Sequence, residues 1–303
     1  MKKISKILAA NRSEIAIRIF RAAEESGIKT AAIYSKEDRF AIHRFKTDES
    51  YLVGEGKGPI QAYLDIDSII KIAKDAKVDA IHPGYGFLSE SPELAEQCEK
   101  NDITFIGPSK EILKRFGNKT EAKKVAQDAD VKTVPSVLVS KENIKTVQKE
   151  VDKIGYPVIV KASWGGGGRG MRVVHSNKDL LDQITTAQSE SLKAFGKDEV
   201  FIEKFLEDAA HIEVQILGDK HGNILHLYER DCSLQRRHQK IIERAPAHFL
   251  KEETRKNICN AAIKIAKEVN YFGAGTVEFL FDKKTGEFYF IEVNPRIQVE
   301  HTV

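Results

Sequence analysis

Short apolar runs alternate with amphipathic segments through the first third of the chain. The runs at 7–10, 30–34 and 78–82 have the length and the β-branched content of buried strands. The segments between them repeat apolar residues at the spacing of a helix that packs on one side. Strands that alternate with helices in this way are typical of a doubly wound, parallel sheet. We therefore expect an α/β domain over residues 1–115.

A different pattern begins after residue 115. Short strands and helices mix between about 135 and 205, which predicts a small α+β unit. Long strands then dominate, and the last two are joined by a turn over 282–286. No linker or polar tail comes before the last residue, Val303. We therefore expect a second domain over 116–303 that is incomplete at its C-terminus.

Charge and cysteine content limit the classes of partner. The net charge is +3, from 48 Lys and Arg against 45 Asp and Glu mixed along the chain, so we expect no nucleic acid and no anionic membrane as partner. No apolar run approaches the roughly 18–20 residues that span a bilayer, and the N-terminus lacks the apolar core of a signal peptide. Cys98, Cys232 and Cys259 lie far apart, which indicates a reducing compartment rather than disulfides or a zinc site. A cytoplasmic location follows.

A glycine-rich segment, 165–170, lies between two predicted strands. Glycines let backbone N–H groups approach an anion closely, and Lys161 and Arg169 beside them add positive charge. A Rossmann or Walker loop would open a helix, so neither is predicted here. We interpret the segment as a lid over a nucleoside triphosphate; the alternative interpretation is a mobile surface loop.

Two acidic side chains and an amide fall on the last pair of predicted strands. Glu292 and Asn294 alternate along one strand and therefore face the same way, and the hairpin brings Glu278 of the neighbouring strand close to them. Carboxylate and amide oxygens are hard ligands of the kind that Mg²⁺ prefers and shares with substrate phosphates. The pattern predicts a metal site, with an ordinary solvated sheet face as the alternative.

The segment that follows these strands is rich in functional groups. Arg296 can form a bidentate clamp on a small planar anion such as bicarbonate, and Glu300 is a candidate general base. An earlier run, 235–240, adds further cationic and amide side chains. That run could also be a nucleic-acid patch, but the near-neutral charge and the lack of interleaved aromatic residues argue against it. A solvated loop is the remaining alternative.

Taken in order, these motifs resemble the biotin carboxylase component of biotin-dependent carboxylases, which has an ATP-grasp fold. The matching stretches extend over the entire chain; they are 8–16, 82–90, 165–170, 229–240 and 292–303. The resemblance implies an ATP-grasp domain over 116–303, with a lid subdomain at about 135–205.

The resemblance also implies a role for each matched residue. The residues expected to bind ATP are Lys119 and Lys161 at the phosphates, Gly167 and Gly168 in the lid, Glu203, Lys204 and Leu206 at the adenine, and His211, Gln235 and His238 along the nucleotide site. Those expected to hold Mg²⁺, with Mn²⁺ as a substitute, are Glu278, Glu292 and Asn294. Those expected around bicarbonate are Lys240, Arg296, Gln298 and Val299, with Glu300 as the base and with Lys240 and Arg296 also counted as catalytic.

The implied reaction is the ATP- and bicarbonate-dependent carboxylation of biotin through carboxyphosphate. The biotin attachment site of this family has a lysine flanked by methionines, and the chain has methionine only at Met1 and Met171. Biotin is therefore expected on a separate carboxyl carrier domain, with a carboxyltransferase domain as a further partner and a homo-oligomeric parent protein. Two alternatives are another ATP-grasp ligase, such as a carbamoyl-phosphate or purine-pathway synthetase, and a nucleotide-binding fragment that is inactive alone.

Overall fold

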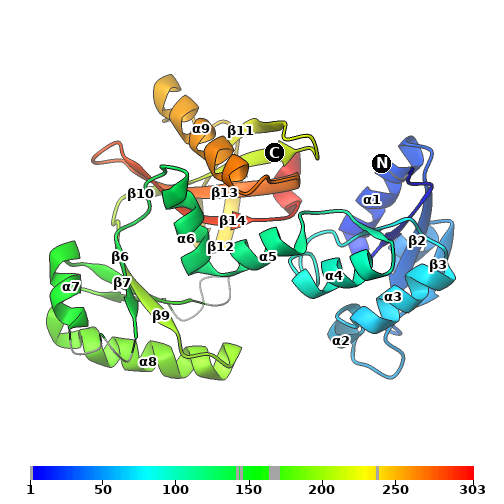
Figure 1. Ribbon diagram of the computed structural model, residues 1–303, viewed down its shortest axis with the longest axis horizontal. Helices are drawn as coiled ribbons and strands as arrows, with labels where there is room; N and C mark the ends of the chain where they lie inside the picture. Colours follow the sequence, from blue (N-terminus) through cyan, green and yellow to red (C-terminus); the bar gives the residue numbers. More distant parts are fainter. Residues whose placement is uncertain (1–2, 141–142, 144–145, 164–170, 237–238) are drawn as a thin grey trace.

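The computed structural model describes residues 3–140, 143, 146–163, 171–236 and 239–303. These residues form three sheets, one parallel and two antiparallel, and helices pack on each of them (Figure 1). The predicted α/β fold class, with a parallel sheet in the N-terminal part, is confirmed.

The N-terminal sheet has the strand order β3–β2–β1–β4–β5, and its neighbouring strands are parallel. Alternate residues of the central strand enter different cores, because Leu8 packs on one face while Ile7 and Ala9 pack on the other. The strands are β1 (Lys6–Ala9), β2 (Lys29–Tyr34), β3 (Glu49–Leu52), β4 (Ala80–His82) and β5 (Thr104–Phe105). The helices are α1 (Ser13–Glu25), the 3-10 turn η1 (Ile42–Phe45), α2 (Pro59–Tyr63), α3 (Ile66–Asp75) and α4 (Pro92–Lys100).

Two helices, α5 (Lys110–Gly117) and α6 (Lys119–Asp128), lead from this sheet to the rest of the molecule. The side chain of Asn118 caps α6 by accepting hydrogen bonds from the backbone N–H groups of Thr120 and Glu121. The cap places Lys119 in the first turn of α6, beside the two antiparallel sheets.

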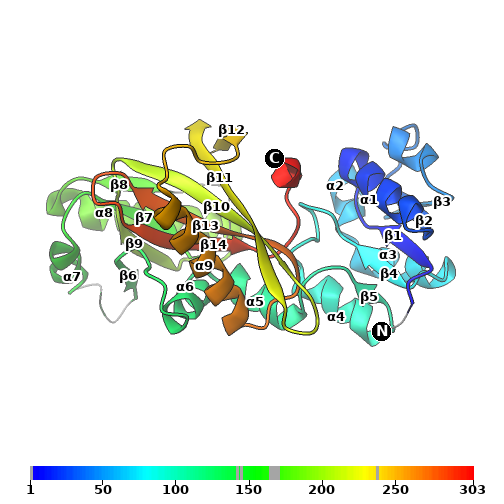
Figure 2. The ribbon, with the colours of Figure 1, turned by 90° about the horizontal axis from the view of Figure 1, so that it is seen from above.

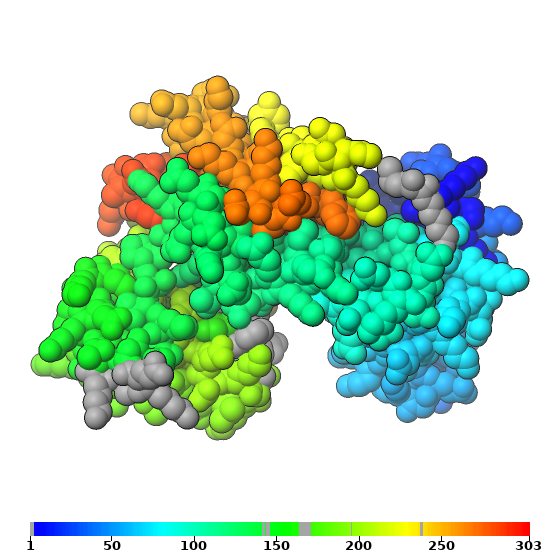
Figure 3. All heavy atoms as spheres, viewed as in Figure 1, coloured from blue at the N-terminus to red at the C-terminus, as the bar shows by residue number. Residues whose placement is uncertain are grey.

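A four-stranded antiparallel sheet with the order β6–β9–β7–β8 has its own apolar core. Its strands are β6 (Ser136–Val139), β7 (Val158–Ala162), β8 (Arg172–Val174) and β9 (Val200–Lys204), and its helices are α7 (Val147–Ile154) and α8 (Asn177–Phe195). In the space-filling view a broad hollow separates this unit from the N-terminal domain (Figure 3).

The third sheet is antiparallel, with the order β12–β11–β10–β13–β14. Its strands are β10 (Ala209–Gly218), β11 (Ile224–Arg236), β12 (Gln239–Arg244), β13 (Gly273–Asp282) and β14 (Phe288–Asn294), with α9 (Glu252–Glu268) before β13 and the 3-10 turn η2 (Val299–Thr302) after β14. Ile212 and Val214 of β10 pack in the core beneath α9, so the alternating His211 and Glu213 face the other way. Seen from above, the C-terminal turn lies between this sheet and the N-terminal domain (Figure 2).

The separate core of the β6–β9 sheet generates a stability prediction. Leu180→Ala should lower the free energy of unfolding of this unit by about 2–5 kcal/mol. Leu180 of α8 is fully buried, so its truncation leaves a cavity. Leu192→Ala is the matched control, since Leu192 lies in the same helix and is 54% exposed. Hydrogen–deuterium exchange should become faster in β7 and β9 for Leu180→Ala alone, with β10 and β13 unchanged. Faster exchange in all three sheets would contradict separate cores.

Candidate active site

A cavity of about 340 Å³ lies between the two antiparallel sheets, with α6 at one side. It brings together most of the residues that the sequence predicts for the nucleotide and the metal: Lys119, Lys161, Glu203, Lys204, Leu206, His211, Gln235, Glu278 and Glu292. Lys240, which is predicted for bicarbonate, lines the same cavity. The predicted Gly167, Gly168 and His238 lie outside the described residues.

Four charged side chains form one row across four neighbouring strands. Arg230 of β11 pairs in register with Glu213 of β10, Glu213 pairs with Glu278 of β13, and Glu278 pairs with Glu292 of β14. Residues directly opposite one another share a sheet face, so three carboxylates are neighbours here. Their repulsion must be offset by cations.

Arg230 is the first of these cations, and it is 3% exposed. Its Nε donates to Oε1 of Glu213 at 2.5 Å, and its Nη1 donates to Oε1 of Gln215 at 3.2 Å. Its Nη2 donates to Oε1 of Gln298 at 3.2 Å. One buried guanidinium therefore holds both a carboxylate of the row and a residue predicted to bind bicarbonate.

Lys240 is the second cation, and three carboxylates surround it. Its Nζ forms an ion pair with Glu213, donates to Oε1 of Glu278 at 3.0 Å and lies 3.5 Å from Oε1 of Glu300. Burial alone would lower the pKa of Lys240, but Glu278 and Glu213 outweigh it and raise that pKa above its usual value. Lys240 thus stays charged and connects the row to the predicted general base.

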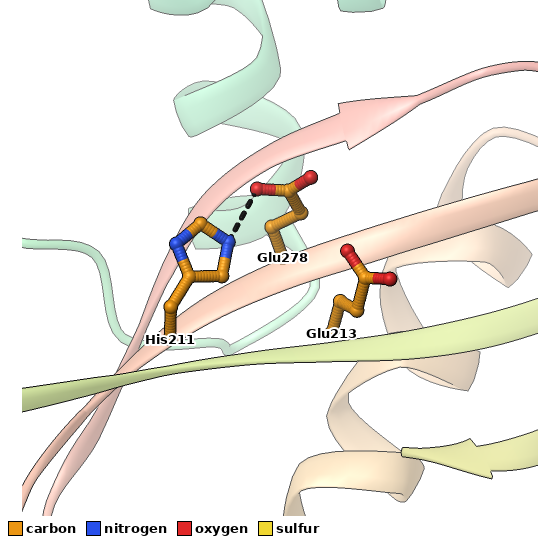
Figure 4. Close-up of side chains that lie close together, drawn as sticks. All are labelled: His211, Glu213 and Glu278. Carbon is orange, nitrogen blue, oxygen red and sulfur yellow. Dashed lines mark hydrogen bonds and ion pairs between the residues drawn. The ribbon is translucent and has the colours of Figure 1, made fainter. Parts of the chain in front are cut away.

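His211 lies beside Glu278 (Figure 4), with its Nε2 2.6 Å from Oε2 of that carboxylate. Burial would raise the pKa of Glu278, but His211 and Lys240 outweigh it and lower that pKa to about 2. Burial would likewise lower the pKa of His211, but the hydrogen bond and the charge of Glu278 raise it. His211, Glu213 and Glu278 place possible ligand atoms within 4.8 Å of one another, yet Lys240 already pairs with both carboxylates. This cluster does not need a metal ion for charge balance.

Glu292 stands at the end of the row and is less well compensated. Its carboxylate lies 3.8 Å from Nζ of Lys119. Burial and the charge of Glu278 both raise the pKa of Glu292. Two opposed carboxylates of this kind fit a hard divalent cation between them. Nδ2 of Asn294 donates to Oε1 of Glu278 at 2.7 Å, so the Asn294 oxygen joins such a site only after the amide turns over.

The predicted anion-binding segment is held from two sides. Nε of Arg296 donates to Oε1 of Glu90 in the N-terminal domain at 2.6 Å, and its Nη2 donates to Oδ1 of Asn294 at 3.3 Å. Gln298 is 3% exposed, whereas Val299 is 55% exposed at the start of η2. Arg296 is therefore already anchored by carboxylate and amide oxygens where the sequence alone predicts a clamp on an anion.

The sequence analysis missed several residues of this site. Glu213 and Arg230 were not assigned a role, nor was Glu90, which lies in the N-terminal domain. The alternation of polar and apolar residues along β10 was the available signal, because His211, Glu213 and Gln215 interrupt an otherwise apolar strand. A strand with one apolar face and one polar face of this kind indicates that the polar face lines a functional site.

Two family models match the chain. Residues 3–113 match the biotin carboxylase N-terminal domain, and residues 118–303 match the ATP-binding domain of the carbamoyl-phosphate synthase L chain. A biotin carboxylase from Campylobacter jejuni, solved as a β-γ-ATP complex, is 47% identical with a TM-score of 0.95, over 99% of this chain and 67% of that one. The chain belongs to the biotin carboxylase family. The ATP-grasp fold expected for its second part is confirmed by this likeness.

Two further relatives are similar over the whole length of this chain. The biotin carboxylase domain of 2-oxoglutarate carboxylase from Hydrogenobacter thermophilus, solved with MgADP, ADP and bicarbonate, is 45% identical with a TM-score of 0.94. The match covers 100% of this chain and 66% of that one. Pyruvate carboxylase of Bacillus subtilis is 57% identical over 302 residues, which is 100% of this chain and 26% of that protein. The chain spans about a quarter of the length of this curated relative.

Within the biotin carboxylase family the sequence resembles the pyruvate carboxylases in particular. Pro295 and Thr302 stand where the acetyl-CoA carboxylase component typically carries Thr and Pro, and Trp164 precedes the glycine run. The segment 54–60 favours the same branch.

In the part of the chain that the structure describes, no helix combines the length and apolar character needed to cross a bilayer.

The buried pair of Arg230 and Glu213 gives a second stability prediction. Arg230→Met should lower the free energy of unfolding by about 3–5 kcal/mol, because it leaves Glu213 buried with one cation fewer. Arg236→Met, at an exposed position of the same strand, should change it by less than about 0.5 kcal/mol. Adding Glu213→Gln to Arg230→Met should restore part of the loss. Urea denaturation followed by circular dichroism measures all of these; equal losses for the two arginines would contradict the assignment.

Proposed function

We propose that the chain performs the first half-reaction of a pyruvate carboxylase, the ATP- and bicarbonate-dependent carboxylation of biotin. The observation that carries this proposal is the contact between two predicted sites. Lys240 lines the cavity that collects the predicted nucleotide residues, and its Nζ lies 3.5 Å from Glu300. A nucleotide phosphate in the cavity would therefore stand next to a base that activates bicarbonate.

The proposed nucleotide site uses residues of both antiparallel sheets. Lys119 and Lys161 both line the cavity, and as cations they are assigned to the phosphates. Glu203, Lys204 and Leu206 hold the adenine, beside His211 and Gln235. Gly167, Gly168 and His238 complete the proposal on sequence resemblance alone. Residues 1–115 then form the N-terminal domain and 116–303 the ATP-grasp domain, whose part at about 135–205 acts as the lid.

Glu278, Glu292 and Asn294 would hold Mg²⁺, with Mn²⁺ as a substitute. A divalent cation bound there supplies positive charge for the phosphate oxygens and for the two opposed carboxylates. The H. thermophilus relative was solved with MgADP and bicarbonate, which supports the same ligands here. In this chain, the register that sets Glu292 directly opposite Glu278 fits a cation between them, and the raised pKa of Glu292 agrees with it.

The proposed chemistry begins at Glu300, which removes the proton from bicarbonate. A bicarbonate oxygen, held by Arg296, Gln298, Val299 and Lys240, attacks the γ-phosphorus, and ADP leaves. The product, carboxyphosphate, divides into CO₂ and phosphate. That phosphate takes the proton from N1 of biotin, and N1 then bonds to CO₂. Exclusion of water by the lid protects the labile carboxyphosphate.

The remaining partners are proposed from the family. Biotin arrives on a carboxyl carrier domain, and a carboxyltransferase domain passes the carboxyl group onward within a homo-oligomer. We propose a cytoplasmic location. The match of residues 118–303 to an ATP-binding domain of carbamoyl-phosphate synthase keeps another ATP-grasp ligase as the second candidate.

The function is tested by ADP release. Release that depends on bicarbonate and rises with free biotin is expected, whereas a carbamoyl-phosphate or purine-pathway ligase would not respond to biotin.

Glu300→Gln should abolish bicarbonate-dependent ADP release while leaving ADP affinity nearly unchanged, because Glu300 acts on bicarbonate. Glu253→Gln, at an exposed position of α9, is the control. Loss of ADP binding in Glu300→Gln would show that its role is wrongly assigned.

The metal site is tested without turnover. Glu292→Gln removes one of two opposed carboxylates, so the protein without metal should be at least as stable as the wild type. Addition of Mg²⁺ to the ADP complex should raise the melting temperature of the wild type but not of the variant. Differential scanning fluorimetry with EDTA or Mg²⁺ measures both effects. An equal Mg²⁺ response in the two proteins would exclude Glu292 as a ligand.

A further inference from the structure

A lysine outside the predicted site holds one of the site's carboxylates. Lys123 lies in α6, and its Nζ forms an ion pair with Oε1 of Glu203 in β9. The other oxygen, Oε2, accepts a hydrogen bond from Nζ of Lys161 in β7 at 2.5 Å. Two lysines from different elements thus each occupy one oxygen of the same carboxylate.

Both members of the Lys123–Glu203 pair are buried. Lys123 is 8% exposed and Glu203 is 5% exposed. Nζ of Lys123 also lies 4.7 Å from the ring centroid of Phe201, a cation–π distance. Burial would raise the pKa of Glu203, but Lys161 and Lys123 outweigh it and lower that pKa. Glu203 is therefore a buried anion that depends on its two lysines.

Lys123 contacts Glu203 and Phe201 of β9 and is not among the described residues that line the cavity. Lys119 and Lys123 are one turn apart and lie on the same side of α6. Lys119 approaches Glu292 at 3.8 Å and lines the cavity. The residues that line the cavity in the described part of the chain include Glu203 and Lys161 but not Lys123. The ion pair with Glu203 is therefore the contact that links Lys123 to a residue of the cavity.

We propose that Lys123 is a positioning residue that keeps Glu203 paired when Lys161 turns to the nucleotide phosphates. The inference rests on the proposed function, in which Lys161 binds phosphate. Without Lys123, moving Lys161 would leave a buried carboxylate bare, which is strongly unfavourable. Lys123 thereby makes Lys161 available to the phosphates at little cost.

The test compares a ligand that carries phosphates with one that does not. Lys123→Met should weaken ADP binding by roughly ten- to a hundredfold, whereas adenosine binding should change by less than about threefold. Adenosine does not draw Lys161 from Glu203, so the pair with Lys161 persists. Lys123→Arg should bind ADP like the wild type. Isothermal titration calorimetry of ADP, with adenosine measured by competition, gives the dissociation constants for the full chain.

A double variant separates charge pairing from packing. In Lys123→Met with Glu203→Gln no buried charge is left bare, so its ADP affinity should lie within about threefold of that of Glu203→Gln alone. This comparison also serves if Lys123→Met by itself does not fold, as judged by thermal unfolding. A larger loss in the double variant would overturn the proposal.

Two further outcomes would overturn it: unchanged ADP affinity in Lys123→Met, or equal losses for ADP and adenosine. Failure of the proposed function is seen separately. If the wild type binds no ADP, or if Lys161→Met does not weaken ADP binding, then the phosphate role of Lys161 is wrong. If Lys161→Met weakens ADP binding and Lys123→Met does not, only the proposed role of Lys123 is contradicted.

Discussion

Three carboxylates meet in one row on a sheet face, and two of them, Glu213 and Glu278, are buried, where charges of like sign repel strongly. The cations around Glu213, Glu278 and Glu292 follow from that repulsion. Arg230 and Lys240 compensate the first two, and Lys119 approaches the last, where we propose a divalent ion. The apolar face of the same sheet packs on α9, so the strands that form the core also fix the spacing of these charges.

The end of the site that is proposed to bind bicarbonate depends on both domains. Glu90 of the N-terminal domain holds Nε of Arg296, while Arg230 of the β10–β14 sheet holds the amide of Gln298. Each contact spans a large separation in sequence, and each fixes a side chain that is proposed to bind bicarbonate. The geometry of this small anion's site is therefore set by the docking of two domains as well as by local backbone.

Local sequence patterns predicted much of the fold and part of the site. The alternation of strands and helices indicated the parallel sheet, and the hairpin correctly brought Glu278 opposite Glu292. The pairing of β10 with β13, two strands that are distant in sequence, could not be deduced this way, so the position of Glu213 beside Glu278 was not predicted. Glu213 and Arg230 themselves lie on consecutive strands, where the polar alternation along β10 was the signal that was overlooked. Lys123 was missed for another reason, because a lysine in an amphipathic helix usually faces solvent. Its burial is seen only in the structure, where it contacts Glu203 and Phe201 of β9.

The hydrophobic core of the β6–β9 sheet is distinct from the one beneath α9. Such cores are able to open independently, each with its own local free energy. Lys161 and Glu203 lie on the β6–β9 sheet, whereas Glu278 and Glu292 lie on the sheet beneath α9. If a ligand contacts all four side chains, then the opening of either sheet breaks some of its contacts and releases it. Occupancy of the cavity would thus convert two loosely linked folding units into one cooperative unit, which resists proteolysis as a whole.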